Sequence, residues 1–386
     1  MKASAISDSM NFLDNEILFT VEKIRNEKTQ KHRKTYGILF AAACLALTAV
    51  SAIFISSFMN SKIPMLELKV NSGDGMGFEG EFLKSSDDFE SDNPWNESGF
   101  VCRLPVFSNN SHDEKGTPCA LTEKQLETYI SNAVSVLGEK VSETKKSYAN
   151  DLYGGYKKDF VYCITAETES FSVTANAAGG LSIFFNTPVP LPYDFNAEST
   201  EDAEKAAEYF ASKYSDLISS FIGFEKPKIS VSTEYNVYGE IHHTYKVFDS
   251  DGSKKEDIVN YNLSFAELRI DNNGALNSIY ICDSSDIITE IAHYPIITEA
   301  SAEKKLISGD FISSVPYDFP GREYISKTDL VYKNERGETV APYYRFLVEL
   351  PEAPEVDEMK NYGIFYVPAV KDNYISQITL IDGIIQ

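Results

Sequence analysis

The feature that most constrains this chain is an apolar run without a single charge over residues 37–59. As a helix rising about 1.5 Å per residue, the run would be about 34 Å long, which is enough to cross a bilayer. Six Lys and Arg residues precede it between positions 23 and 34, whereas the following chain soon becomes acidic. By the positive-inside tendency, the sequence predicts a single-pass signal-anchor with residues 1–36 in the cytosol and the C-terminal region outside the cell membrane. A cleaved signal peptide is the alternative, but residues 57–61 form a poor cleavage site.

The charge differs between the two ends of the chain. Residues 1–36 carry seven basic and five acidic side chains, whereas residues 60–386 carry 28 basic and 53 acidic ones. An acidic region of this size disfavours nucleic acid and anionic lipid, because both attract Lys and Arg. We therefore expect no nucleic-acid partner, and we expect the membrane to be contacted only through residues 37–59.

Four apolar residues of the cytosolic tail follow helical spacing: Leu13, Ile17, Val21 and Ile24. Intervals of four, four and three place them on one stripe of an amphipathic helix. One interpretation is a helix that docks on a partner or on the inner membrane surface. The other is a partly ordered leader, since a short isolated helix is only marginally stable. The sequence leaves both open.

Beyond the apolar run, composition and periodicity divide the chain into a linker and three units. Residues 60–94 are acidic and rich in Gly and Ser, which is typical of a linker. Residues 95–195, 196–292 and 293–386 each contain a predicted helix followed by several predicted strands. The predicted fold class is therefore α+β, with one transmembrane helix followed by three repeated units in which a helix covers an antiparallel sheet.

Local signals place the helices and strands. Thr122 and Gln125 have capping-box spacing and predict a helix to about residue 137, and two more helices are expected over 199–221 and 298–308. Asn273-Gly274 predicts a tight hairpin between strands 257–270 and 275–282. The other strands are expected at 143–149, 159–167, 171–175, 181–186, 228–237, 240–248, 325–334, 339–350, 363–370 and 374–381.

The last third of the chain resembles a known type of protein. The resemblance rests on His293-Tyr-Pro-Ile-Ile-Thr-Glu-Ala-Ser-Ala-Glu-Lys-Lys-Leu-Ile-Ser-Gly309, on Leu330-Val-Tyr, on Ala341-Pro-Tyr-Tyr-Arg-Phe and on Gly363-Ile-Phe-Tyr-Val-Pro-Ala369. These segments resemble the extracytoplasmic part of uncharacterised single-pass proteins of Gram-positive bacteria, which has PepSY-like units. They are distantly similar to the YycH and YycI accessory proteins of a cell-wall sensor kinase. The resemblance implies regulation by protein contact and brings no catalytic residue.

The sequence carries no catalytic motif. Gly-x-Ser-x-Gly, His-Glu-x-x-His and a phosphate-binding glycine loop are absent from residues 60–386, and the histidines there have no obvious nucleophile beside them. His242 and His243 are neighbours in a predicted strand, so they point to opposite faces and do not share a metal. We expect no enzyme activity, cofactor or metal, although a triad assembled from distant residues stays open.

Cysteines and tyrosines give two further expectations. Cys102 and Cys119 flank a polar loop and form the candidate disulfide; the alternative is that they, Cys163 and Cys282 are separate thiols. The tyrosine-rich runs at 153–156, 343–344 and 362–366 suit either a glycan or peptide groove or cross-strand packing, and alternating aromatics in strands favour packing.

Together these observations favour a membrane-anchored extracytoplasmic binding or regulatory protein that acts by contact with a membrane or cell-wall partner. The alternative is a membrane-anchored cell-wall hydrolase or carbohydrate-binding enzyme.

Overall fold

The computed structural model describes residues 63–71, 79–86, 93–96, 101–110, 121–152, 159–235, 241–250, 253–333, 339–353 and 359–381. These ranges all lie within one compact unit, residues 63–386. Most of their regular structure is strand, arranged in three sheets of eight, six and two strands.

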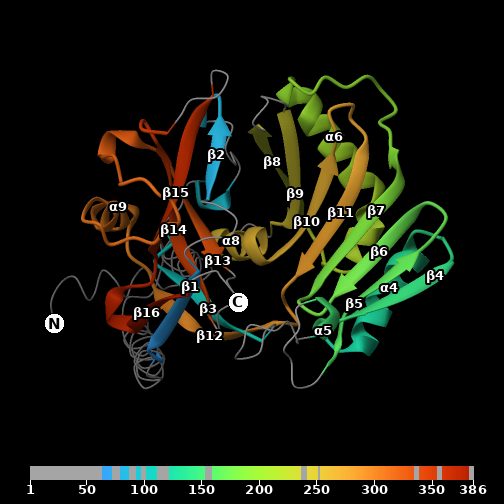
Figure 1. Ribbon diagram of the computed structural model, residues 1–386, viewed down its shortest axis with the longest axis horizontal. Coiled ribbons are helices and arrows are strands. Elements are labelled where there is room, and N and C mark those ends of the chain that lie inside the picture. The colour runs from blue at the N-terminus through green and yellow to red at the C-terminus, as the bar shows by residue number, and fades with distance from the viewer. Residues whose placement is uncertain are drawn as a thin grey trace, which may run out of the picture. The chain divides into compact units, whose positions relative to one another are not determined.

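The largest sheet has eight antiparallel strands (Figure 1). Their spatial order is β4 (Glu143–Tyr148), β5 (Val161–Glu167), β6 (Phe171–Asn176), β7 (Gly180–Val189), β11 (Leu276–Asp283), β10 (Ser264–Ile270), β9 (Ile241–Asp249) and β8 (Pro227–Tyr235). β7 pairs with β11, so Ile183 lies opposite Ile279. This pairing joins strands from the first and second predicted units into one continuous sheet.

Helices cover one face of this sheet (Figure 1). α4 (Glu123–Val136) packs on β5 and β6, and α6 (Thr200–Lys213) packs on β8, β9 and β10; the short α7 (Ser215–Ser219) follows. Phe210 of α6 and the strand residues Ile183 and Leu268 are fully buried in the core between the layers. Burial of these side chains holds the helices on the sheet, because removing apolar surface from water is the main favourable term in folding.

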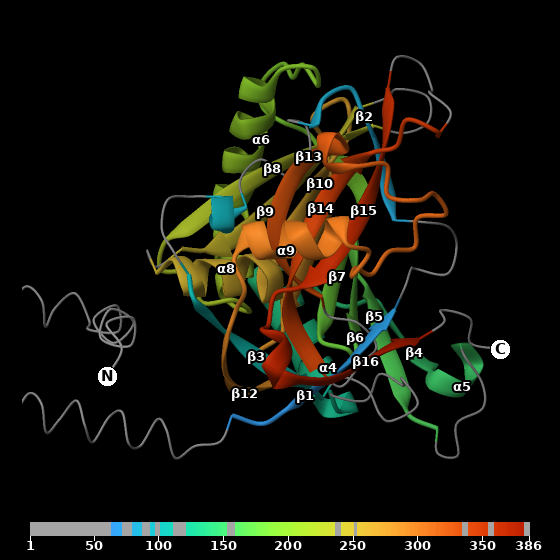
Figure 2. The same cartoon turned by 90° about the vertical axis from the view of Figure 1, so that its left-hand side faces the viewer.

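The second sheet combines strands that are far apart in the sequence. It contains β12 (Ile288–Pro295), β3 (Arg103–Asn109), β14 (Thr339–Glu349), β15 (Lys360–Pro368) and β2 (Gly80–Leu83), and β13 (Ile325–Lys333) also pairs with β14. α9 (Glu299–Ile307) lies across one face of it (Figure 2). Ala302 and Leu306 of α9 are buried with Phe365 and Val348 of the sheet.

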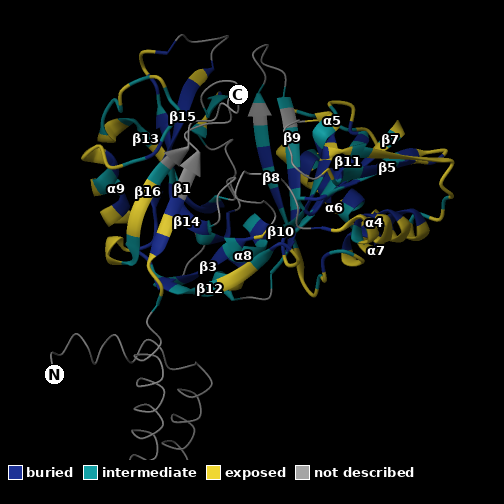
Figure 3. Cartoon of the chain, turned by 60° about the horizontal axis from the view of Figure 1, so that its bottom comes forward, coloured by how far each residue is buried: buried dark blue, intermediate teal, exposed yellow. Residues whose placement is uncertain are grey.

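The other face of the six-stranded sheet packs against the start of the described chain. β1 (Leu66–Asn71) pairs in parallel with β16 (Ile375–Ile381). Leu66, Leu68 and Leu83 are buried in one cluster with Tyr343 and Tyr362. Figure 3 colours the strands by how far their residues are buried. Two strands and buried leucines therefore lie inside residues 60–94, where the sequence predicts a linker.

One predicted strand is wrong in its first half. Residues 254–263 form the helix α8 (Lys254–Leu263), and only the part from Ser264 onward is strand, where residues 257–270 were predicted to be extended. α8 contacts β9, β10 and β13, so it bridges the two large sheets. Ile258 and Tyr261, three positions apart, are buried on one side of the helix, and this non-local packing overrides the strand-like pattern.

The predicted fold class needs correction. The described chain is mostly β, and it is not a series of three helix-plus-sheet units, because the first two predicted units share one eight-stranded sheet and the third takes in β2 and β3. Of the predicted boundaries, that at 195/196 falls between β7 and α6, and that at 292/293 falls inside β12.

The membrane predictions also need correction. Within the described ranges, no helix combines the length and the apolar character that a membrane span requires. This finding contradicts the single-pass topology, and with it the membrane partner and the cell-membrane localisation. Residues 37–59, on which the predicted span rested, lie outside the described residues.

Candidate binding site

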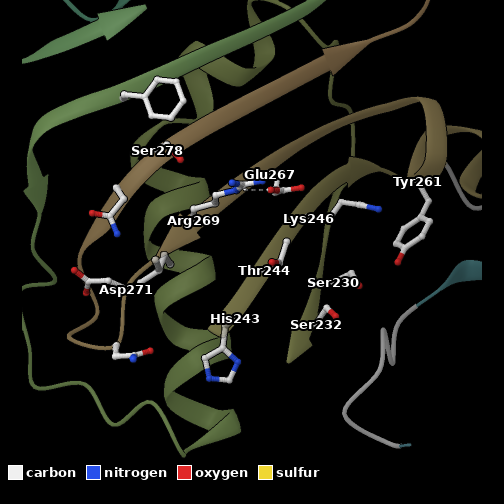
Figure 4. Close-up of a pocket in the computed structure, with 14 residues that line it drawn as sticks. Ser230, Ser232, His243, Thr244, Lys246, Tyr261, Glu267, Arg269, Asp271 and Ser278 are labelled. Atoms are coloured by element: carbon white, nitrogen blue, oxygen red, sulfur yellow. Dashed lines mark hydrogen bonds and ion pairs between the residues drawn. The ribbon is translucent and has the colours of Figure 1, made fainter. Parts of the chain in front are cut away.

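The face of the eight-stranded sheet opposite α4 and α6 is polar and carries a pocket of about 670 Å³ (Figure 4). Side chains from β7, β8, β9, β10 and β11 line it. Ligand pockets in proteins commonly measure about 300–1,000 Å³. The pocket is thus large enough for a small organic ligand or for several units of a chain-like one.

Strand alternation explains why this face is polar. In β8, Ile229 and Val231 pack toward the helices, so Ser230 and Ser232 lie on the pocket face. In the cross-strand register, Ser232 lies opposite Thr244, which lies opposite Arg269, which in turn lies opposite Ser278. Adjacent strands are about 4.8 Å apart, so this row presents a polar side chain at about that interval across four strands.

Four hydroxyl groups on this face have no partner in the part of the chain that the structure describes. Ser232 and Ser278 are buried, as is Ser230 of the next row, whereas Thr244 is half-buried. Within the described residues, none of these four side chains hydrogen-bonds to another group. None of the four oxygens belongs to the buried side-chain atoms that lack a partner, so solvent reaches them through the pocket. Four accessible hydroxyls without a partner in the described chain, gathered in one recess, are available to hydrogen-bond to a ligand.

The charged groups of the pocket balance one another. Glu267 Oε1 lies 2.8 Å from Arg269 Nε, and the Glu267 side chain is only 17% exposed where that of Arg269 is 68% exposed. Lys246 lies opposite Glu267 in the register, and its Nζ lies 4.2 Å from the centre of the Tyr261 ring. Asp271 Oδ1 accepts hydrogen bonds from the backbone N–H groups of Asn273 and Ala275, both at 2.9 Å. Two cations and two anions thus leave the pocket without net charge.

Aromatic side chains mark its edges. Phe184 of β7 lies opposite Ser278 in the register, so it is next to the row of hydroxyls. Its side chain is 52% exposed. Tyr261 reaches the pocket from α8, and Lys246 lies between it and Arg269 (Figure 4). A half-exposed phenylalanine on a polar surface is available to stack on a ligand.

Both ring nitrogens of His243 form hydrogen bonds that hold the fold together. Its Nε2 lies 2.7 Å from the Ala197 carbonyl oxygen and therefore carries the donated proton, and its Nδ1 lies 3.1 Å from Thr233 Oγ1 and accepts from that hydroxyl. Both ring nitrogens are engaged with groups of the fold. His243 therefore links β8 and β9 to the loop before α6, and neither nitrogen is free to act as a base.

The structure places the predicted site residues as follows. Leu13, Ile17, Val21, Ile24 and Cys119 lie outside the described residues, so the docking helix and the Cys102–Cys119 disulfide stay predictions.

Of the other cysteines, Cys102, Cys163 and Cys282 are half-buried, and no disulfide joins these three to one another. The tyrosines at 343, 344, 362 and 366 are buried in the cores around the six-stranded sheet, which confirms that they pack and do not form a groove. The run at 153–156 lies outside the described residues. In the parts of the chain covered by the structure, no group of three or more His, Cys, Asp and Glu residues is placed to hold a metal ion.

Sequence reasoning missed Ser230, Ser232, Thr244 and Ser278. Their signal is weak: polar residues at alternate strand positions are expected on any sheet face exposed to water. Which strands are neighbours, and where the face is recessed, depends on pairing between distant segments.

No family model matches this chain, and no curated protein matches it. One solved structure, of an uncharacterised protein from Eubacterium rectale ATCC 33656, is similar over 72% of this chain and 87% of its own, with 11% identity and a TM-score of 0.38. A TM-score of this size supports no conclusion about fold or function, so function must be inferred from the pocket itself.

Proposed function

We propose that this chain is a binding protein that acts by contact, and that its ligand occupies the polar pocket of the eight-stranded sheet. The observation that carries the proposal is the set of hydroxyls on Ser230, Ser232, Thr244 and Ser278, which have no partner among the described residues and lie inside a recess of about 670 Å³. A site of this kind supplies hydrogen bonds that are already positioned before the ligand arrives, which lowers the ordering cost of binding.

The state of the charged groups favours binding over catalysis. A nucleophilic hydroxyl needs a base within hydrogen-bond reach, and that base is usually held by a third group. The four hydroxyls have no such partner among the described residues. Glu267 is engaged by Arg269, and Asp271 is engaged by the turn after β10. These engagements argue against the alternative of a cell-wall hydrolase.

The test is a ligand screen by thermal unfolding of the full chain. The panel holds neutral oligosaccharides, short peptides, nucleotides and inorganic phosphate. A ligand that binds only the folded state stabilises it by about 2.7 kcal/mol at 100 times its Kd, which raises the unfolding temperature measurably. We expect at least one class to raise it and to be recovered chemically unchanged. A panel in which no class raises the unfolding temperature would contradict the proposal.

Two matched variants localise the effect. Thr244→Arg fills the pocket and should abolish the shift. Thr128→Arg makes the same substitution at an exposed position of α4, on the opposite side of the sheet, and should leave the shift intact. Equal shifts in the two variants would place the binding site elsewhere on the molecule.

A further inference from the structure

We infer that the ligand of the polar pocket is a neutral saccharide chain. This inference rests on the proposed function and narrows it to one ligand class. Three features of the pocket carry it: its charge balance, its row of hydroxyls and its exposed aromatic ring.

The charge balance disfavours ionic ligands. The chain has a formal net charge of −23, yet the pocket itself is lined by two cations, Lys246 and Arg269, and two anions, Glu267 and Asp271. A phosphate or nucleotide at Arg269 would be in competition with the negative charge of Glu267, whose Oε1 lies 2.8 Å from Arg269 Nε and already neutralises it. Inorganic and nucleotide phosphates are usually bound by unopposed cations or helix N-termini. An uncharged ligand requires no such competition.

The hydroxyl row suits a ligand that itself carries hydroxyls. A Ser or Thr hydroxyl both donates and accepts, and its hydrogen rotates to fit the partner. Ser232, Thr244 and Ser278 therefore match sugar hydroxyls, which also donate and accept, in whatever direction each one points. Arg269, between Thr244 and Ser278 in the register, adds donors that its bond to Glu267 leaves unused.

Phe184 supplies an apolar stacking surface, which hydroxyl groups cannot provide. A pyranose ring has an apolar face of C–H groups, and that face stacks on an aromatic ring. Phe184 is 52% exposed and lies next to Ser278 across the β7–β11 pair, so a sugar that bonds to Ser278 has an aromatic surface beside it. Burial of an aromatic ring of this kind contributes strongly to binding energy.

Sheet topology disfavours an extended peptide. Peptides that bind sheets usually add a strand at an edge, where backbone groups are free. β7, β9, β10 and β11 each pair with a strand on both sides, so their backbone groups in the pocket floor are already used. β8 is the edge strand of the sheet, so an added peptide strand would lie beside β8 and outside the floor; over β7, β9, β10 and β11 a ligand meets side chains.

The experiment is calorimetric titration of the full chain with two neutral hexasaccharides, cellohexaose and chitohexaose, beside a polar hexapeptide and inorganic phosphate. We expect at least one hexasaccharide to bind, and the peptide and phosphate not to bind. Removing two of the hydroxyls with Thr244→Val and Ser278→Ala should weaken saccharide binding about thirtyfold, because each hydrogen bond contributes about 1 kcal/mol. Phe184→Ala should also weaken it at least about fivefold.

A control pair removes the same chemical groups from the same face outside the pocket. Thr165→Val with Ser147→Ala, on β5 and β4, should leave saccharide affinity unchanged. Saccharide affinity that is equal in the two double variants would overturn the inferred site.

Binding of the peptide or phosphate without either saccharide would overturn the ligand class and leave the proposed binding function standing. A chain that binds none of the four probes, and no other member of the wider panel, would contradict both.

Discussion

At the scale of single residues, the most costly arrangement is a buried ion pair in the six-stranded sheet. Asp329 of β13 lies opposite Arg345 of β14, with Oδ2 at 3.1 Å from Nη2. The Asp329 side chain is only 1% exposed, and that of Arg345 is 12% exposed. A charge buried to this extent is tolerated because its partner is present, and removing one partner leaves the other uncompensated.

Asp329→Asn keeps the shape of the side chain and removes its charge. We expect the free energy of unfolding to fall by about 3–5 kcal/mol, measured by urea denaturation. Glu201→Gln is the matched control, because Glu201 and Lys205 form an ion pair in which both side chains are more than half exposed. The control should not change stability measurably. Equal effects of the two substitutions would mean that the buried pair contributes no more than a surface one.

His293 gives the chain a pH-dependent stability. Burial lowers the pKa of its imidazole below the ordinary 6.5, and Lys255 and Arg103 act in the same direction, which together outweigh Glu290, whose Oε1 lies 3.2 Å from Nε2. The folded state therefore binds fewer protons than the unfolded state near that pH. Stability linked to His293 is present above pH 6.5 and is lost as the pH falls below it.

His293→Gln removes this contribution. We expect the free energy of unfolding of the native chain to decline from pH 7 to pH 5.5, and the variant to show a shallower decline over the same range. Urea denaturation at a series of pH values measures both slopes. A variant with the same slope as the native chain would show that other groups set this pH dependence.

At the scale of elements, the β10–β11 hairpin shapes one end of the pocket. Residues 272–274 form a three-residue loop between Asp271 and Ala275, and Gly274, its last residue, adopts the positive φ of +77° that such a loop requires. A Cβ at this position would lie 2.7 Å from Phe195 Cβ and 2.8 Å from Leu191 Cδ1, both in the segment between β7 and α6. The turn is therefore held by its backbone conformation and by close packing, and Asp271 at its start is held with it.

Gly274→Ala should destabilise the protein by about 2 kcal/mol, since it combines a left-handed backbone with a steric clash. Gly223→Ala is the control, because a Cβ there meets no atom within 4 Å. Thermal unfolding should show a lower melting temperature for the first variant and little change for the second. Similar melting temperatures would mean that the hairpin relaxes without cost.

Local signals predicted most elements, and non-local packing explains the failures. Thr122 and Gln125 form the capping box that the sequence predicts, and α4 begins directly after it. The Asn273-Gly274 hairpin is also confirmed, since β10 and β11 pair across it. α8 was missed because its short apolar spacing fits a strand equally well, and contacts with two sheets decide the outcome.

At the scale of the whole described unit, pairing between distant segments determines what the sequence could not show. β1 pairs with β16 across some 310 residues, so a stretch that resembles a linker becomes part of the fold. In the same way, β7 and β11 join two predicted units into one sheet. The pocket depends on this second pairing, because it brings Phe184 next to Ser278. No local pattern predicts either contact.

The most direct test of the pocket as a binding site is a methyl NMR titration of the full chain with chitohexaose or cellohexaose, using threonine labelled with ¹³C at its methyl group. We expect the Thr244 signal, from the pocket, to move with saccharide concentration. Thr174, on the same face of the sheet but outside the pocket, and Thr128, exposed on α4, should not move. A Thr244 signal that stays fixed while either of the others shifts would contradict the assignment of the pocket as the binding site.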